Sequence, residues 1–98
     1  MNARQYFFQQ VVDSDLTGEQ LRVLMCMLTA ESDGVIGIKQ KEIAEMLNIA
    51  ESNVSRSIKA LAEAGLLSKK VTTGFDGRPV WQIDPIFEKR ARARANRL

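Results

Sequence analysis

The sequence predicts a mainly α-helical domain with a small β-hairpin and a basic C-terminal helix. Apolar residues recur at helical spacing from about residue 18 to residue 65. The pattern then changes to that of two strands around the turn-forming stretch TGFDG at 73–77. Residues 84–98 begin with Asp and Pro, an N-cap followed by proline at the first helical position. We therefore expect one domain made of an N-terminal arm or strand (1–15), a core (16–83) and the basic helix (84–98).

The composition argues against enzyme chemistry and against a zinc site. The chain has no histidine and a single cysteine, Cys26, so it lacks the commonest general base and the ligand set of a structural zinc. No glycine-rich phosphate-binding loop is present. We expect no catalytic residue, no bound metal and no cofactor. A single cysteine suits a reducing compartment, and no apolar run approaches the ~18 residues that cross a bilayer, so we expect a cytoplasmic protein.

The segment before the core, QYFFQQVV at 5–12, is aromatic and β-branched, and its pattern fits a strand or a short helix. The core begins with a capping-box pattern, Thr17 followed by Gln20, which predicts a helix over 18–30. Two apolar stripes run along that helix, so we expect burial on more than one side, against the N-terminal segment or a partner chain. The first stripe comprises Leu21, Leu24, Met25 and Leu28, and the second comprises Val23, Met27 and Ala30 beside Cys26, an expected buried thiol.

A brief strand and a short helix are predicted next. The β-branched piece between Gly34 and Gly37 indicates a turn and a short strand. The stretch KQKEIAEML at 39–47 has its apolar positions on one helical face, and Asn48 tolerates the left-handed conformation that ends a helix.

The following helix is predicted from Ala50 or Glu51 to Gly65, which is a good C-terminal cap position. Because only about three residues separate the two helices, the pair is typical of a helix-turn-helix. On a helical wheel the buried face comprises Ala50, Val54, Ile58 and Leu61. The opposite face comprises Ser52, Arg56, Lys59 and Glu63, with Asn53 and Ser55 on the flanks.

The last part of the core, LLSKKVTTGFDGRPVWQI at 66–83, predicts a strand, a turn and a second strand. Pro79 lacks an amide proton, so it fits the start of an edge strand. We expect Trp81 to pack at the base of this hairpin. For Phe75 at its tip, contact with a minor groove or with a partner stays open.

The polar face of the second helix carries the residue types that recognise bases in the major groove. Arginine pairs with guanine, asparagine with adenine, and serine with base edges or phosphates. Basic residues of the hairpin would lie beside that helix, suited to phosphate or minor-groove contact. The alternative interpretation is that these side chains contact only water and bind nothing. We predict contacts to double-stranded DNA from Lys39, Gln40, Ser52, Asn53, Ser55, Arg56, Lys59, Lys69 and Arg78.

The positive charge is concentrated at the C-terminal end. The chain has a net charge of +2, but residues 84–98 alone hold a larger excess, which leaves the remainder slightly acidic. Three interpretations of this basic segment stay open: it binds phosphates, it docks onto a partner protein, or it is a helix that only contacts water. The side chains concerned are Lys89, Arg90, Arg94 and Arg97.

The stretch QKEIAEMLNIAESNVSRSIKALAEAGLLSKK at 40–70 resembles the winged helix-turn-helix core of bacterial regulators of the multiple-antibiotic-resistance (MarR) type. Its most specific part is VSRSIKALAEAGLL at 54–67. The stretch DSDLTGEQLRVLMCML at 13–28 is also similar to the opening of plasmid RepL-like initiators and of lambdoid replication O proteins. The resemblance covers about residues 15–83 and implies a DNA-binding winged helix.

This sequence departs from the family pattern in two places. The recognition helix of such proteins commonly begins with a capping serine or threonine, whereas Ala50 or Glu51 stands here. Full MarR-type proteins also carry long dimerisation helices at both ends, where this chain has only a short N-terminal segment and the basic tail. We therefore do not extend the family's ligand pocket to this chain.

Three functions are compatible with these patterns. The first is a homodimeric, sequence-specific transcription regulator of bacterial, plasmid or phage origin, which blocks a promoter by occupancy. The second is a replication or partition protein that binds DNA at an origin or centromere. The third is a protein-interaction module without DNA binding, favoured by Glu51 and the near-neutral body. The first two place the protein on the nucleoid or on a plasmid, with no membrane partner.

Overall fold

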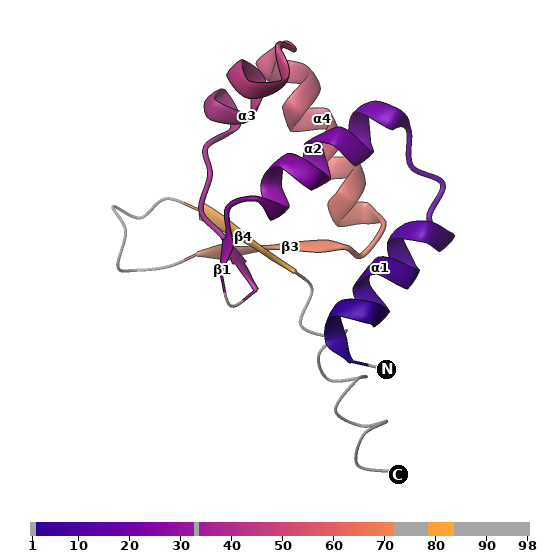
Figure 1. The fold of residues 1–98 in the computed structure, drawn as a ribbon. Helices are drawn as coiled ribbons and strands as arrows, with labels where there is room; N and C mark the ends of the chain where they lie inside the picture. Colours follow the sequence, from indigo (N-terminus) through magenta and orange to yellow (C-terminus); the bar gives the residue numbers. More distant parts are fainter. Residues whose placement is uncertain (1, 33, 72–78, 84–98) are drawn as a thin grey trace, which may run out of the picture.

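The computed structural model describes residues 2–32, 34–71 and 79–83. Within these ranges α2, α3 and α4 gather on one side of a small antiparallel sheet, and α1 lies at the end of the molecule away from α3 (Figure 1). The order of elements is α1 (Ala3–Asp13), α2 (Gly18–Leu28), β1 (Glu31–Ser32), β2 (Val35–Ile36), α3 (Gln40–Leu47), α4 (Glu51–Glu63), β3 (Leu67–Val71) and β4 (Pro79–Ile83). The prediction of a mainly helical fold with a small hairpin is confirmed.

The N-terminal segment, which the sequence left open, is the helix α1 and not a strand or an extended arm. Asn2 accepts a hydrogen bond from the Gln5 backbone amide at 2.8 Å, and the Gln5 side chain accepts one from the Asn2 amide at 2.9 Å. This reciprocal capping box fixes the start of α1. Phe7 is 2% exposed and joins α1 to the core, whereas Val12 is 76% exposed.

The predicted capping box of α2 is confirmed. Thr17 accepts from the Gln20 amide at 3.2 Å, and the Gln20 side chain accepts from the Thr17 amide at 3.0 Å. The helix ends at Leu28, two residues earlier than predicted, with Thr29 as its C-cap. Four residues of α2 are buried: Val23, Leu24, Cys26 and Met27.

The prediction that both apolar stripes of α2 are buried is wrong for part of the first stripe. Leu21 is 37% exposed and Met25 is 56% exposed. These two positions are one turn apart on the same side of the helix, toward the opening between α2 and α3. The described part of the chain therefore leaves an apolar strip of α2 accessible.

The helix-turn-helix is formed by α3 and α4. Asn48 has φ 55° and ψ 48°, the left-handed conformation predicted for the end of α3. Ala50 is the N-cap of α4, so Asn48, Ile49 and Ala50 form the turn. At the other end Gly65 has φ +78°, and the Leu66 amide donates to the Leu61 carbonyl at 3.1 Å. Many helices end in this way, with a glycine in the left-handed conformation and the next amide donating to a carbonyl five residues earlier.

The buried face of α4 differs from the predicted one at two positions. Val54, Ile58 and Leu61 are buried as expected. Ala50 is exposed because it is the N-cap and has an extended backbone, whereas a helical wheel places only residues with helical backbone angles. Ser57 takes its place in the buried face, at 4% exposure.

The sheet has the strand order β1-β2-β4-β3, and each neighbouring pair is antiparallel. Therefore β4 is an inner strand, and the prediction of an edge strand for it is wrong. Pro79 is nevertheless tolerated for a clear reason. It pairs with Val71 on β3, while the β2 register reaches only Gln82 and Trp81. At Pro79 the strand has no β2 neighbour that would need its missing amide proton.

One hydrophobic core connects these layers. It is built by the inner faces of α2, α3 and α4, by Ile36 of β2 and by Leu66 and Leu67 at the start of β3, and α1 contributes Phe7. Trp81 is half-buried and packs against this core, as predicted for the base of the hairpin. Residues 72–78, with Phe75, and the predicted basic helix 84–98 lie outside the described residues.

Candidate nucleic-acid interface

The second helix of the helix-turn-helix presents a polar face on the side opposite its core contacts. Ser52, Ser55, Arg56 and Lys59 are exposed, and Asn53 is half-buried on the flank. Val54, Ile58 and Leu61 hold the other side of α4 in the core. Because three fully packed side chains fix the rotation of the helix, its polar residues are displayed in a fixed direction. The five residues predicted on α4 for DNA contact therefore lie on its polar face or on the flank of that face.

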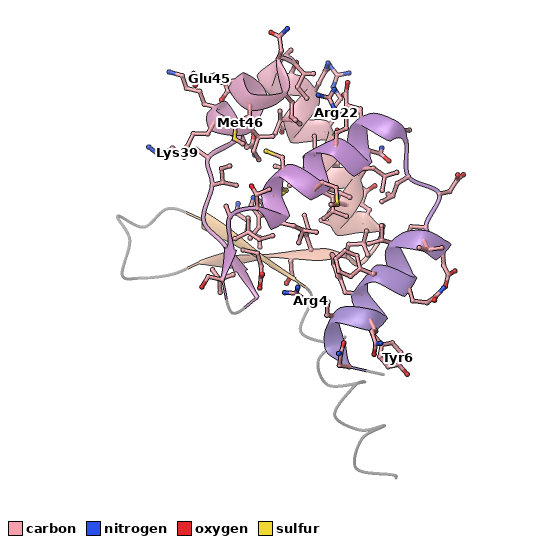
Figure 2. All side chains as sticks on the ribbon, viewed as in Figure 1. Arg4, Tyr6, Arg22, Lys39, Glu45 and Met46 are labelled. Atoms are coloured by element: carbon pink, nitrogen blue, oxygen red, sulfur yellow. The ribbon has the colours of Figure 1, made fainter. Side chains whose placement is uncertain are left out.

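The start of α3 supplies a second group. Lys39 is exposed at the N-cap of α3, and Gln40 is half-buried at its first position. Figure 2 shows Lys39 and Glu45 pointing outward from α3. Lys41, which the sequence-based prediction did not include, is exposed in the first turn of α3. Its place in the run KQK, next to two selected residues, was the available signal.

Both helices of the helix-turn-helix begin without a side-chain cap. Lys39 before α3 and Ala50 before α4 are in the extended conformation, and neither side chain accepts a hydrogen bond from the helix. The first amides of a helix have no partner within the helix, and the helix dipole makes that end partly positive. The departure from the family pattern at Ala50 thus leaves the first amides of α4 available to an anion. Glu51, exposed in the first turn, adds a negative charge there.

The sheet adds one described basic residue. Lys69 of β3 is exposed and lies directly across from Trp81 of β4 in the register. Directly paired residues of an antiparallel sheet have their side chains on the same face. The strand β3 also packs against α4. Arg78 lies outside the described residues, as do Lys89, Arg90, Arg94 and Arg97.

Within residues 2–32, 34–71 and 79–83 there is no group of three or more His, Cys, Asp or Glu side chains that could hold a metal ion. None of the helices in these same residues is long and apolar enough to cross a membrane.

Comparison with known proteins agrees with this geometry. Residues 14–79 match the family model MarR_2, which is described as the MarR family. S. aureus MepR bound to ethidium bromide is similar in fold, with a TM-score of 0.61, 22% identity, 96% of this chain covered and 65% of that chain. A crystal structure of an S. aureus MepR-DNA complex gives a TM-score of 0.59 at 22% identity, covering 95% of this chain and 73% of that one.

A zinc-responsive MarR family member, Lactococcus lactis ZitR, is also similar, with a TM-score of 0.55 and 24% identity over 85% of this chain and 54% of that chain. The chain thus spans about two thirds of the MepR chain in its ethidium complex and about half of the ZitR chain. No curated protein matches the sequence. The matched family model covers α2 to the start of β4, which includes the whole helix-turn-helix. The chain belongs to the MarR family.

Proposed function

We propose that this protein is a sequence-specific, double-stranded DNA-binding transcription regulator that acts by occupying an operator. It has no enzymatic activity in this proposal. The observation that carries it is the two-sided character of α4. One side is locked into the core by Val54, Ile58 and Leu61, and the other exposes Ser52, Arg56 and Lys59 to solvent. The major groove admits one α-helix, and these side chains have the donors and acceptors that base edges require.

Phosphate contacts would set the position of α4 in the groove. The uncapped amides at the start of α3 and α4 suit phosphate oxygens, because the partly positive end of a helix attracts anions. Lys39 and Lys41 are exposed at the start of α3, Lys69 is exposed on β3, and all three carry the opposite charge to DNA. Such contacts hold a protein in register without reading the sequence. In this proposal Arg78 on the hairpin and the basic tail extend the phosphate contacts along the duplex.

A homodimer is part of this proposal. Phe8 and Val12 lie one turn apart on α1 and expose apolar surface, at 41% and 76%. We name this pair the apolar α1 face. A surface helix of a monomer normally keeps its exposed side polar, so this face is suited to a second copy of the chain. A two-fold dimer would place two copies of α4 about 34–36 Å apart, one turn of DNA.

The proposal is tested by selection of binding sites from a library of random duplexes with the purified full-length chain. We expect enrichment of one motif made of two half-sites related by two-fold symmetry. Footprinting on the DNA around the coding sequence should then protect a single such site over a promoter. Several directly repeated sites at an origin or centromere would instead assign the replication or partition role. If no motif is enriched and binding does not weaken with salt, the protein is an interaction module without DNA binding.

A further inference from the structure

An open pocket of about 440 Å³ lies between α2 and α3, outside the proposed DNA-binding face of α4. Three of the side chains that line it contain sulfur. The lining includes Leu21, Arg22, Met25, Cys26, Met46 and Leu47. Both methionines of this lining are unusually accessible, since Met25 is 56% exposed and Met46 is 61% exposed.

The thiol and one thioether meet across the pocket. Cys26 Sγ of α2 and Met46 Sδ of α3 are 3.8 Å apart, although the two residues are distant in sequence. Cys26 is 6% exposed and is therefore held in place by the core, while Met46 extends from α3 beside α2 (Figure 2). Metal–sulfur bonds in proteins are about 2.3 Å long, so one ion can bridge two sulfur atoms that are up to about 4.6 Å apart. The observed separation lies within that reach without any change in the backbone.

We propose that Cys26 and Met46, with Met25 as a third sulfur ligand, form a binding site for a soft monovalent metal ion, Cu(I). Thiolate and thioether ligands select Cu(I) over the harder divalent ions. The described part of the pocket lining has no carboxylate and the chain has no histidine, so Cys26 is the one ligand there of the kinds that Zn²⁺ takes. The sequence-based expectation of no metal considered histidine and cysteine as ligands and did not consider methionine. This inference is independent of the proposed DNA binding.

The charge balance of the pocket also favours a monovalent ion. As the Cys26–copper bond forms, the thiol proton is released to solvent, and thiolate and Cu(I) together are neutral. Arg22 is the charged residue that lines the described pocket. Its positive charge would oppose a site with a net positive charge, such as a thiolate with a divalent ion, but not a neutral unit. A bound ion would tie α2 directly to α3, the first helix of the helix-turn-helix.

The test is an anaerobic titration of the full-length chain with Cu(I) in competition with a chromophoric Cu(I) chelator. We expect one equivalent to be withdrawn from the chelator, with a sulfur-to-copper charge-transfer band in the ultraviolet. Thermal unfolding with Ag(I), a redox-stable substitute, should show a raised Tm, because a ligand that binds only the folded state stabilises it.

Three variants make the test specific. Cys26→Ala should abolish binding, and Met46→Leu should weaken it by at least about tenfold, since even groups that only support a metal ligand change affinity about 10- to 100-fold. Met46 is largely exposed, so its variant keeps the fold. Met27→Leu is the matched control, because Met27 is on α2 but fully buried in the core, and it should bind as the parent does. Failure of the parent chain to compete for Cu(I), or unchanged affinity in Met46→Leu and Cys26→Ala, would overturn the proposal.

Discussion

Phe7 and Phe8 are neighbours in sequence, and their rings meet edge to face with centroids 5.5 Å apart and planes at 73°. Their environments nevertheless differ, since Phe7 is 2% exposed and Phe8 is 41% exposed. Successive residues of a helix differ by about 100° in direction. One aromatic ring therefore attaches α1 to the core, and the next helps to form the apolar α1 face.

This difference predicts unequal effects on stability. Phe7→Ala should lower the free energy of unfolding by about 3–5 kcal/mol, the usual cost of removing a buried aromatic side chain. Phe8→Ala should cost clearly less in the monomer, because much of its ring is already in water. Urea unfolding of the two variants at low protein concentration compares them directly. Equal losses would mean that α1 is not attached through Phe7.

The apolar α1 face predicts the oligomeric state. Sedimentation at micromolar concentration should show a dimer for the parent chain. Val12→Glu should convert it to a folded monomer, because a charge would be buried unpaired at the interface while the side chain is 76% exposed within one chain. Glu45→Gln, an exposed change on α3, is the control and should stay dimeric. A parent that sediments as a monomer with and without DNA rules the dimer out.

The basic tail predicts a change in salt dependence. Deleting residues 89–98 should weaken binding to all duplexes about equally and leave the preferred motif unchanged. Each lost phosphate contact should reduce the slope of log affinity against log salt by about 0.9. Titration of the full-length and truncated chains over a salt series measures both slopes. An unchanged slope, together with lost assembly on longer DNA, would assign the tail to a protein partner.

Much of the fold was predictable from local signals. Residues close in sequence determine the capping box at Thr17, the left-handed conformation of Asn48 and Gly65, and the short turn before α4. These features could therefore be predicted without knowledge of the tertiary structure. The same is true of the polar face of α4, since the apolar residues Val54, Ile58 and Leu61 fix its direction by helical period alone.

Features that depend on distant contacts were not predictable. The position of β4 inside the sheet depends on its pairing with β2, which lies far away in sequence. The exposure of Met25 depends on how far α3 extends over α2, and the contact between Cys26 and Met46 depends on the same packing. The sequence left α1 undecided between a strand and a helix for a different reason. Its short aromatic run is ambiguous by period, and the Asn2–Gln5 capping box was the decisive local signal.

Cys26 predicts a measurable dependence of stability on pH. Burial raises the pKa of the Cys26 thiol above its ordinary value of 9.0. Because the thiol ionises first in the unfolded chain, its contribution to stability is complete below that value and is lost as the pH rises toward the folded pKa. Urea unfolding from neutral pH to about pH 10.5 should show this loss for the parent relative to Cys26→Ala, since the two proteins differ only at this thiol. A pH-independent difference between the two proteins would contradict it.

The central claim is that α4 reads DNA sequence, and Arg56 tests it most directly. Arg56 is exposed on the polar face of α4, so its replacement by alanine should leave the fold intact. Arg4→Ala is a matched control, because it removes an exposed arginine from α1 instead. Both variants should melt at the temperature of the parent.

The decisive measurement is fluorescence anisotropy of the parent, Arg56→Ala and Arg4→Ala chains with the selected duplex and with a random duplex at one fixed salt concentration. We predict that Arg56→Ala loses about 1–3 kcal/mol of binding free energy on the selected site and tolerates substitution of one base pair that the parent rejects. Arg4→Ala should keep the affinity and the preference of the parent. If Arg56→Ala binds the selected and the random duplex as well as the parent does, α4 is not the recognition helix of this protein.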